Sequence, residues 1–507
     1  MRVIFSISAI ILLFTSAHYS IGQEKESTFD HIQAIKEAAS ASTFKDAVLS
    51  LCIMGMDGDK KLGINETKML VPASNMKLIS TGTALHELGP EFRFRTDIQY
   101  DGEISEGTLH GNLYIKGGAD PTLGSKDTIA TDLEITFLQW KKFLDDSGIQ
   151  RIEGSVVGDG SWLDGMSEEQ TWMWNDIGTY YGSGVTGLMF YENMQSFIAK
   201  PGLAEGDPVD IRPSYPDAPW MEFRYTCTTG KPKTGDRLYM FTSDLAPVAE
   251  IRGTLGIDRG TKRVDCSNKF PEYTCAHYFV EWLSRKGITC SEGAADYKLG
   301  KDRRKPDDSS RITAGSTFSP SLSRIAYTTN HASNNLYAET LLRTLGKELR
   351  SHSSYDSSYV AVNDVLCRLM SGNCTGIRIQ DGSGLSRQNL VSAEFFCRFL
   401  NAMAGSPNFC CFLESLPRPG GNGTLHYNMS RVSSDIKSRI RVKSGSMNGI
   451  RCYSGYIMPS GQCDGWSVKT APEGTLVFSI MVNNCTAPDW EVRRKLDKIM
   501  ELAASLN

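Results

Sequence analysis

The stretch VPASNMKLISTGTALHELGP, residues 71–90, places a serine and a lysine at the beginning of an amphipathic segment. Four residues at helical spacing, Leu78, Thr81, Leu85 and Leu88, fall on one helical face. The Gly-Pro pair that follows is typical of a helix end. Ser74 and Lys77 are three positions apart, and this spacing puts two helical side chains on one face with about 5–6 Å between their Cβ atoms. The stretch therefore predicts a helix with a serine and a lysine side by side at its start.

The composition is that of an ordinary globular protein. The chain has 507 residues, of which 40% are hydrophobic and 22% charged, and its net charge is −4. This length predicts more than one domain and ample core. Because no long run of Lys or Arg occurs, a nucleic-acid partner is not expected.

The N-terminus predicts export. Arg2 is followed by an apolar run over residues 3–14, and the small residues Ser20 and Gly22 lie where a signal peptidase needs them. A retained membrane anchor is the alternative, but the apolar run is short for a bilayer. No other segment has the pattern of a membrane span. We expect a signal peptide at residues 1–22, no integral membrane segment after its removal, and a mature protein in the periplasm or cell envelope.

The number of cysteines predicts disulfide bonds but not their pairing. Thirteen cysteines in an exported chain favour some disulfide bonds, and the odd number excludes complete internal pairing. The pairing cannot be derived from the sequence. The chain has no Cys-x-x-Cys pair and no His-Glu-x-x-His motif, so metal chemistry has no support in the sequence.

The two ends of the chain have similar predicted structure, and the middle differs. The predicted helices lie at Phe29–Ala41, from Ser74 to the stop at Gly89–Pro90, at Asp132–Asp146, Leu322–Thr329, Leu336–Leu345 with its end at Gly346, and near the C-terminus with Val492, Leu496, Ile499, Ala503 and Leu506 on one face. The predicted strands lie at Ala47–Met56, on both sides of the hairpin turn Asn448–Gly449, and in GTLVFSIMVNN. Between residues 92 and 311 short alternating segments and Gly/Asp turns predict a β-rich inserted region of two subdomains. The polar run at residues 298–311 is a candidate linker at its exit.

Three short patterns of polar residues recur along the chain. They are Ser-x-x-Lys at Ser42, Ser74 and Ser434, Ser-x-Asn at Ser333, Ser371, Ser406 and Ser446, and Lys-(Ser/Thr)-Gly at Lys233 and Lys443. An isolated match is usually a solvated serine or lysine. Context favours Ser74, which opens an amphipathic helix, and Ser333, which lies between two helices. It also favours Lys443, which lies on a strand leading into a hairpin, over Lys233, whose Thr/Gly/Pro-rich surroundings predict a surface turn.

Taken together, these motifs resemble a known family. Four stretches occur in its order, P-A-S-N-M-K-L, S-N-N-L-Y-A-E, D-G-S-G-L-S-R and V-K-S-G-S. They resemble the penicillin-binding protein 4 type of D-alanyl-D-alanine carboxypeptidase/endopeptidase, and further matches are GNLYIKGGADPTL, GDGSW, WNDI and GNGTL. The long interval between Ser74 and Ser333 is characteristic of this family, which carries extra domains there.

The resemblance implies an α/β fold of the penicillin-recognising, β-lactamase/transpeptidase-like type. An antiparallel sheet made from both chain ends would be covered by helices. Residues 23–91 and 312–507 would form this discontinuous catalytic domain, and residues 92–311 would be inserted. The implied substrates are peptidoglycan stem peptides, the implied inhibitors are β-lactams, no cofactor is implied, and the oligomeric state is left open.

The resemblance also implies site residues. Ser74 would be the nucleophile and Lys77 its base, with a pKa lowered by burial or by a neighbouring cation such as Lys443. Ser333 would relay a proton to the leaving amine, and Asn335 would hold Lys77 and the substrate amide. The remaining implied roles are an oxyanion hole from the backbone N–H groups of Ser74 and Ser446, and substrate binding by Lys443, Ser444 and Gly445.

Two residues are weaker candidates for substrate binding. Asp159 matches the family aspartate that meets the amino group of a diaminopimelate side chain, and a turn residue is the alternative. Arg387 would help to shape the cleft, with a structural role as the alternative, and Asp381 is expected to cap its loop. The chain departs from the usual motifs at Ser444, which keeps a hydroxyl, and at Asn334, which replaces Asp.

Two other functions stay open on the sequence. A β-lactamase, D-amino-acid amidase or esterase would use the same motifs and differ in how fast water clears the acyl-enzyme. An inactive envelope-binding or scaffolding protein would keep the fold without the chemistry, although here all three motifs are complete.

Overall fold

The structure, a computed structural model, describes residues 29–299, 308–461 and 470–506. The expected signal peptide at residues 1–22 lies outside these ranges. Within them, no helix is both long enough and apolar enough to cross a membrane.

The described chain forms two compact units. The first comprises the residues up to Asn75, Cys374–Ile377 and the residues from Leu390 onward. The second comprises Met76–Asn373 and Arg378–Asn389. The chain crosses between the units directly after the predicted nucleophile, between Asn75 and Met76, so each unit carries some of the predicted site residues.

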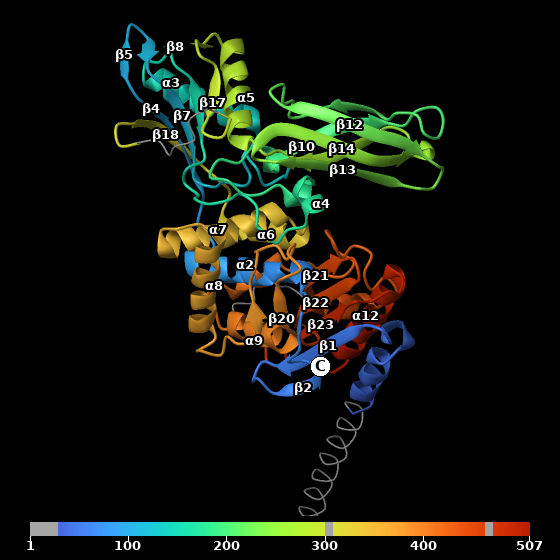
Figure 1. Cartoon of the computed structure of the whole chain (residues 1–507). Coiled ribbons are helices and arrows are strands. Elements are labelled where there is room, and N and C mark those ends of the chain that lie inside the picture. Colours follow the sequence, from blue (N-terminus) through green and yellow to red (C-terminus); the bar gives the residue numbers. More distant parts are fainter. Residues whose placement is uncertain (1–28, 300–307, 462–469, 507) are drawn as a thin grey trace, which may run out of the picture. The chain divides into compact units, whose positions relative to one another are not determined.

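The first unit is built on a five-stranded antiparallel sheet with the strand order β2-β1-β23-β22-β21 (Figure 1). Its strands are β1 (Val48–Gly55), β2 (Lys60–Ile64), β21 (Ile440–Met447), β22 (Ile450–Ile457) and β23 (Leu476–Asn483). Gly449 has φ 74° in the turn between β21 and β22, a conformation that glycine adopts without strain. The predicted sheet from both chain ends, with its hairpin, is confirmed.

Helices pack on both faces of this sheet because strand side chains alternate between the faces. On one face Leu51, Val442 and Ile480 share a hydrophobic cluster with the helix at residues 29–39 and with α12 (Asp489–Ala504). The other face meets α9 (Ala393–Ala404), where the Tyr456 hydroxyl donates to the Leu400 carbonyl at 2.7 Å. The predicted N-terminal and C-terminal helices are confirmed.

The other elements of the first unit are short. They are η1 (Ser42–Phe44), β3 (Met69–Leu70), η2 (Ala73–Asn75), β20 (Leu390–Ser392), α10 (Phe409–Ser415) and α11 (Ser434–Arg439), and β19 (Ile377–Arg378) lies at the boundary. Among the cysteines, Cys367 and Cys374 are disulfide-bonded, whereas Cys52, Cys275 and Cys452 are buried free thiols. The expectation of some disulfide bonding is confirmed, and the buried thiols pack as small apolar side chains.

Four helices of the second unit pack against one another, α2 (Met76–Leu88), α6 (Leu322–His331), α7 (Asn335–Arg350) and α8 (Tyr355–Leu369). The prediction that the helix after residue 336 ends at Gly346 is wrong. A Cβ atom added at Gly346 would lie 2.4 Å from Ser358 Oγ of α8, so this glycine allows two helices to approach closely. The helix ends instead at Arg350, and its C-cap Ser351 has φ 60°.

The remainder of the second unit is β-rich, as predicted for residues 92–311, and contains two separate hydrophobic clusters. Figure 1 shows the strands β12 to β14 apart from those beside α3 and α5. The first part has the sheets β17-β9-β7-β4-β18 and β16-β8-β6-β5, and the second has β11-β10-β15 and β12-β14-β13. The elements of the first part are β4 (Arg95–Tyr100), β5 (Glu103–Ser105), β6 (Thr108–His110), β7 (Leu113–Gly117), α3 (Leu133–Asp146), β8 (Arg151–Ile152), β9 (Val156–Asp159), α5 (Pro271–Arg285), β16 (Thr289–Cys290), β17 (Ala294–Asp296) and β18 (Ile312–Phe318). Three short helical segments precede the second part, α4 (Trp174–Ile177), η3 (Tyr180–Gly182) and η4 (Tyr191–Asn193). The elements of the second part are β10 (Met194–Lys200), β11 (Asp210–Pro213), β12 (Glu222–Gly230), β13 (Asp236–Ser243), β14 (Ala246–Gly256), η5 (Ile257–Arg259) and β15 (Lys262–Ser267).

Candidate active site

In the first unit, Ser74 is the middle residue of the single turn η2. The residue before it, Ala73, has φ 46°, a left-handed conformation that costs a non-glycine residue about 1–2 kcal/mol. Such strain persists only where the surroundings impose it, and it clusters at functional sites. Here the Asn75 amide Nδ2 donates to Ser454 Oγ of β22 at 2.7 Å, which ties the turn to the sheet. The backbone around Ser74 is therefore held rigidly.

The Lys-Ser-Gly tripeptide lies on β21, the edge strand of the same sheet. A Cβ atom at Gly445 would lie 2.6 Å from the Pro72 carbonyl oxygen and 3.1 Å from the Asn75 nitrogen. Only a glycine lets β21 pass this close to the turn that carries Ser74. The structure thus brings Ser74 and the Lys443 tripeptide together, although they are 369 positions apart.

The side chains of this tripeptide are ordered by short contacts. Lys443 is fully buried, and its Nζ donates to the Ser444 carbonyl at 2.7 Å. The Ser444 hydroxyl lies 3.1 Å from the Thr424 hydroxyl, whereas Ser446 is exposed. Thr424 was not predicted as a site residue, although it belongs to the matched stretch GNGTL.

In the second unit, Lys77 is fully buried on α2 and donates two strong hydrogen bonds. Its Nζ lies 2.7 Å from Asn335 Oδ1 and 2.7 Å from the Ser383 carbonyl. Asn335 is the first residue of α7, and its Nδ2 donates to the Tyr181 carbonyl at 2.9 Å. Because a carbonyl only accepts, this bond decides which way the amide points and turns its oxygen to Lys77.

Burial lowers the pKa of Lys77 from 10.5 to about 7, and the carboxyl groups of Asp381 and Glu339 oppose this change. The low dielectric of the interior disfavours the ammonium form. A lysine with a pKa near 7 is substantially neutral at neutral pH and can accept a proton. Of the two expected causes, burial or a neighbouring cation, burial accounts for the lowered value.

Two buried carboxyl groups organise the loop beside Lys77. Glu339 accepts hydrogen bonds from the backbone nitrogens of Gly382 at 2.9 Å and Ser383 at 2.7 Å. Asp381 accepts from the Gly384 nitrogen at 2.7 Å, so the expected loop-capping role is confirmed. Burial raises the pKa of Glu339 to about 8 and also raises that of Asp381.

Glu339 was missed by the sequence analysis. It lies four residues after Asn335 on α7, and this spacing places both side chains on one helix face. The stretch SNNLYAE contained the signal, because a charged residue at that spacing from the predicted amide contact of Lys77 faces the same region.

The loop between α6 and α7 has the predicted position. Ser333 lies in it with φ 55°, a second strained residue within the predicted site. Asn334 caps α7 by accepting from the Tyr337 nitrogen at 3.1 Å, and it donates to Glu192 Oε2 at 2.7 Å. Because Asn and Asp are equally good N-caps, the departure at Asn334 leaves this role intact.

The two weaker candidates for substrate binding, Asp159 and Arg387, interact with other residues of the protein. The Asp159 carboxylate is fully buried and forms an ion pair with Arg311 Nη1 at 2.6 Å. Arg311 belongs to the polar run at residues 298–311, so that end of the run is packed rather than solvated. Arg387 is exposed, and its guanidinium opposes the burial that raises the pKa of Asp176. Among the described residues, no group of three or more His, Cys, Asp or Glu side chains is placed to hold a metal ion.

Comparisons with known proteins identify the family and the fold. A profile of the D-Ala-D-Ala carboxypeptidase 3 (S13) family matches residues 32–506. The chain is similar to a D-alanyl-D-alanine carboxypeptidase of Actinomadura sp. strain R39, with 26% identity over 431 residues, 83% of this chain and 74% of the relative. It is also similar to the penicillin-sensitive carboxypeptidase A of Dictyostelium discoideum, with 26% identity over 460 residues, 87% of this chain and 83% of the relative.

A solved structure gives the same result for the fold. The crystal structure of penicillin-binding protein 4 from Haemophilus influenzae superposes with a TM-score of 0.75 at 18% identity, covering 94% of this chain and 98% of that one. Its complex with a β-lactam has a TM-score of 0.71 at 17% identity, covering 93% and 97%. At this level of identity the likeness establishes the fold, which is the penicillin-recognising α/β fold expected from the sequence.

Proposed function

This chain belongs to the D-Ala-D-Ala carboxypeptidase 3 (S13) family and is a serine D-alanyl-D-alanine carboxypeptidase, and from that premise we propose that Ser74 is its acylated nucleophile and Lys77 its general base. Lys77, neutral in part at pH 7, takes the hydroxyl proton as Ser74 Oγ attacks the penultimate D-Ala carbonyl. The spacing of three positions at the start of a helix suits this transfer. The bond between the two D-alanines then breaks and leaves an acyl-enzyme that water hydrolyses.

The remaining residues are assigned by what each step needs. Backbone N–H groups of Ser74 and Ser446 stabilise the tetrahedral oxyanion, with about 3–4 kcal/mol for each donor. Ser333 passes the proton to the departing amine. Lys443 and the Ser444 hydroxyl bind the terminal carboxylate by a charge-assisted hydrogen bond, and Gly445 leaves room for the substrate backbone. Asn335 orients Lys77 and the substrate amide.

One observation carries this proposal above the others. Lys77 is fully buried, its nitrogen is held at 2.7 Å by Asn335 Oδ1 and by the Ser383 carbonyl, and its pKa is lowered to about 7. Burying a lysine ammonium group is unfavourable for stability, because the charged form loses its hydration. Such a group is expected where proton transfer needs it.

The test is acylation by a labelled penicillin together with release of D-alanine from a D-Ala-D-Ala pentapeptide. The wild type should form a stable labelled adduct at Ser74 and release D-alanine, and Ser74→Ala should do neither. Rapid turnover of the penicillin would instead indicate a β-lactamase. Absence of both reactions in the folded wild type would indicate a scaffolding protein.

The finer parts of the proposal concern location and substrate. Residues 1–22 act as a signal peptide, and the mature enzyme trims peptidoglycan stem peptides in the cell envelope and is inhibited by penicillins. The name of the penicillin-sensitive relative supports the inhibition. Asp159 and Arg387 are further substrate-binding candidates, and the proposal includes cutting of cross-links as a second activity. Digestion of intact sacculi separates the two activities, because an endopeptidase converts dimeric fragments to monomers and a carboxypeptidase releases only D-alanine.

A further inference from the structure

The Tyr181 carbonyl accepts from the Asn335 amide nitrogen and so directs the amide oxygen toward Lys77. Tyr181 belongs to a short segment, residues 178–184, that is far from α7 in the sequence. Tyr181 supplies this carbonyl from η3. The start of the segment is tied to the end of β15, where the Ser267 nitrogen donates to the Gly178 carbonyl at 3.0 Å. The segment is not a strand or a long helix, so its conformation depends on such individual bonds.

The far end of the segment is held by a buried ammonium group. Lys269 Nζ donates to the carbonyls of Gly182 at 3.2 Å and Ser183 at 3.3 Å, and it pairs with Glu168 Oε1 at 2.7 Å. A lysine ammonium has three donor hydrogens. Two of these donors go to the peptide carbonyls directly after Tyr181, and the Glu168 carboxylate balances the charge of the ammonium group as an ion pair.

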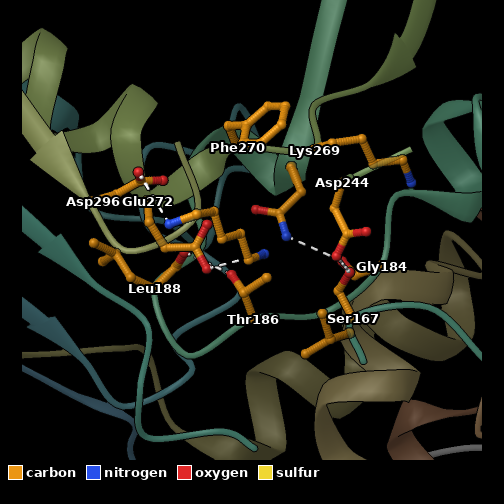
Figure 2. Close-up of polar contacts among 12 residues, drawn as sticks. Ser167, Gly184, Thr186, Leu188, Asp244, Lys269, Phe270, Glu272 and Asp296 are labelled. Atoms are coloured by element: carbon orange, nitrogen blue, oxygen red, sulfur yellow. Dashed lines mark hydrogen bonds and ion pairs between the residues drawn. The ribbon is translucent and has the colours of Figure 1, made fainter. Parts of the chain in front are cut away.

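Lys269 belongs to a larger buried network of charges, which matters for the control experiment. Figure 2 shows Lys269, Asp244, Glu272 and Asp296 around the stretch from Gly184 to Leu188. A second lysine of this network, Lys298, pairs with Glu272 at 3.3 Å. Burial lowers the pKa of Lys269, with the carboxylates of Glu168 and Asp244 opposing and the Lys298 ammonium reinforcing the change.

We propose that Lys269 is a positioning residue for the reaction: anchored by Glu168, it fixes the Gly182 and Ser183 peptides so that the Tyr181 carbonyl keeps the Asn335 amide oxygen on Lys77. The inference rests on the proposed function, because it takes Lys77 as the base. A buried ion pair gives little net stability, since desolvation offsets the attraction. An apolar side chain of the same size could fill the space of Lys269, but it could not donate hydrogen bonds to the two consecutive carbonyls.

The experiment compares Lys269→Met with Lys298→Met, its matched control in the same network. For each full-length variant, the second-order rate of acylation by a labelled penicillin is measured from pH 5 to 9, together with thermal unfolding. Lys269→Met should acylate about 10- to 100-fold more slowly, because small misplacements of a catalytic group have effects of this size. The midpoint of its rate-against-pH curve should lie at a lower pH than in the wild type. A rotated Asn335 amide no longer accepts from the Lys77 ammonium, so the charged form of Lys77 is less stable and loses its proton at lower pH. The two titratable carboxyl groups that face Lys77, Asp381 from the loop after residue 380 and Glu339 from α7, are unchanged in this variant. Lys298→Met should keep the wild-type rate and midpoint.

Rescue by a conservative variant separates positioning from mere folding. Lys269→Arg keeps a cation with donors for both carbonyls and should recover much of the rate and the midpoint. Should Lys269→Met not fold, Glu168→Gln removes the anchor with little change of shape and should shift the rate and midpoint in the same direction. Wild-type rate and midpoint in Lys269→Met, or in Glu168→Gln where that variant is used, overturn the inference. Equal losses in Lys269→Met and Lys298→Met that follow their stabilities overturn it too. A wild type that is never acylated at Ser74 defeats the proposed function instead, so the two failures are distinguishable.

Discussion

The Lys-(Ser/Thr)-Gly pattern occurs in two regions of the molecule, and the two copies have opposite surroundings. Lys233 is exposed in the turn between β12 and β13, has φ 67°, and its backbone nitrogen donates to Asp258 at 3.1 Å. Lys443 is fully buried on β21, and Gly445 two positions later lies against the turn that carries Ser74. The predicted surface turn at Lys233 is confirmed.

The difference shows that the tripeptide by itself carries no chemistry. At Lys233 water solvates the ammonium group, and the flexible side chain loses little free energy when it exchanges a ligand for water. At Lys443 the strand fixes the backbone, burial removes competing water, and electrostatic interactions are stronger in that medium. The copy that matches the family motif less literally has the structural setting that a binding site requires.

The sharpest test of this comparison removes each lysine in turn. Lys443→Met should slow acylation by penicillin about 100- to 1000-fold, the loss found when one preorganised donor is removed from a catalytic site. Lys233→Met should leave the rate unchanged because the side chain is solvated. Stopped-flow acylation of both variants gives the two rates. Equal rates in the two variants would break the comparison.

The pH dependence of acylation distinguishes buried from exposed lysine chemistry. The pKa of Lys77 is lowered to about 7 by burial, and the base must be neutral to accept a proton. The rate should therefore rise with pH through about 7 and fall about tenfold for each pH unit below it. Rates measured with a label that does not titrate between pH 5 and 10 give the midpoint. A midpoint near 10, the value for a solvated lysine, would contradict the assignment of Lys77.

The smallest expected effects come from the glycines of the two tripeptides. Gly445→Ala places a Cβ atom 2.6 Å from the Pro72 carbonyl oxygen and must displace backbone, so it should cost about 1–3 kcal/mol of stability and also slow acylation. Gly235 has φ 81° with open space around it, so Gly235→Ala should cost only about 1 kcal/mol through backbone strain. Urea unfolding measures both. If Gly445→Ala kept full stability and rate, the close approach of β21 to the turn would be unimportant.

Much of the fold and most of the candidate site could be predicted from the sequence. Helical spacing identified the Ser74 and Lys77 segment, Asn448–Gly449 identified the hairpin, and apolar runs identified β1 and β23 of the five-stranded sheet. The misinterpretation of Gly346 has a physical reason, since glycine serves both as a helix end and as a close helix contact, and only the position of α8 distinguishes them. Glu339 and Thr424 were missed because they act through neighbours in space.

The sequence by itself determined the identities and local settings of the reactive groups, because periodicity, turn residues and motif spacing are local properties of the chain. Only the tertiary structure decided that Lys77 loses its solvent, that the Tyr181 carbonyl orients Asn335, and that Arg311 neutralises Asp159. Desolvation and hydrogen-bond direction depend on groups that are tens to hundreds of positions away, and no local pattern encodes which of them will meet.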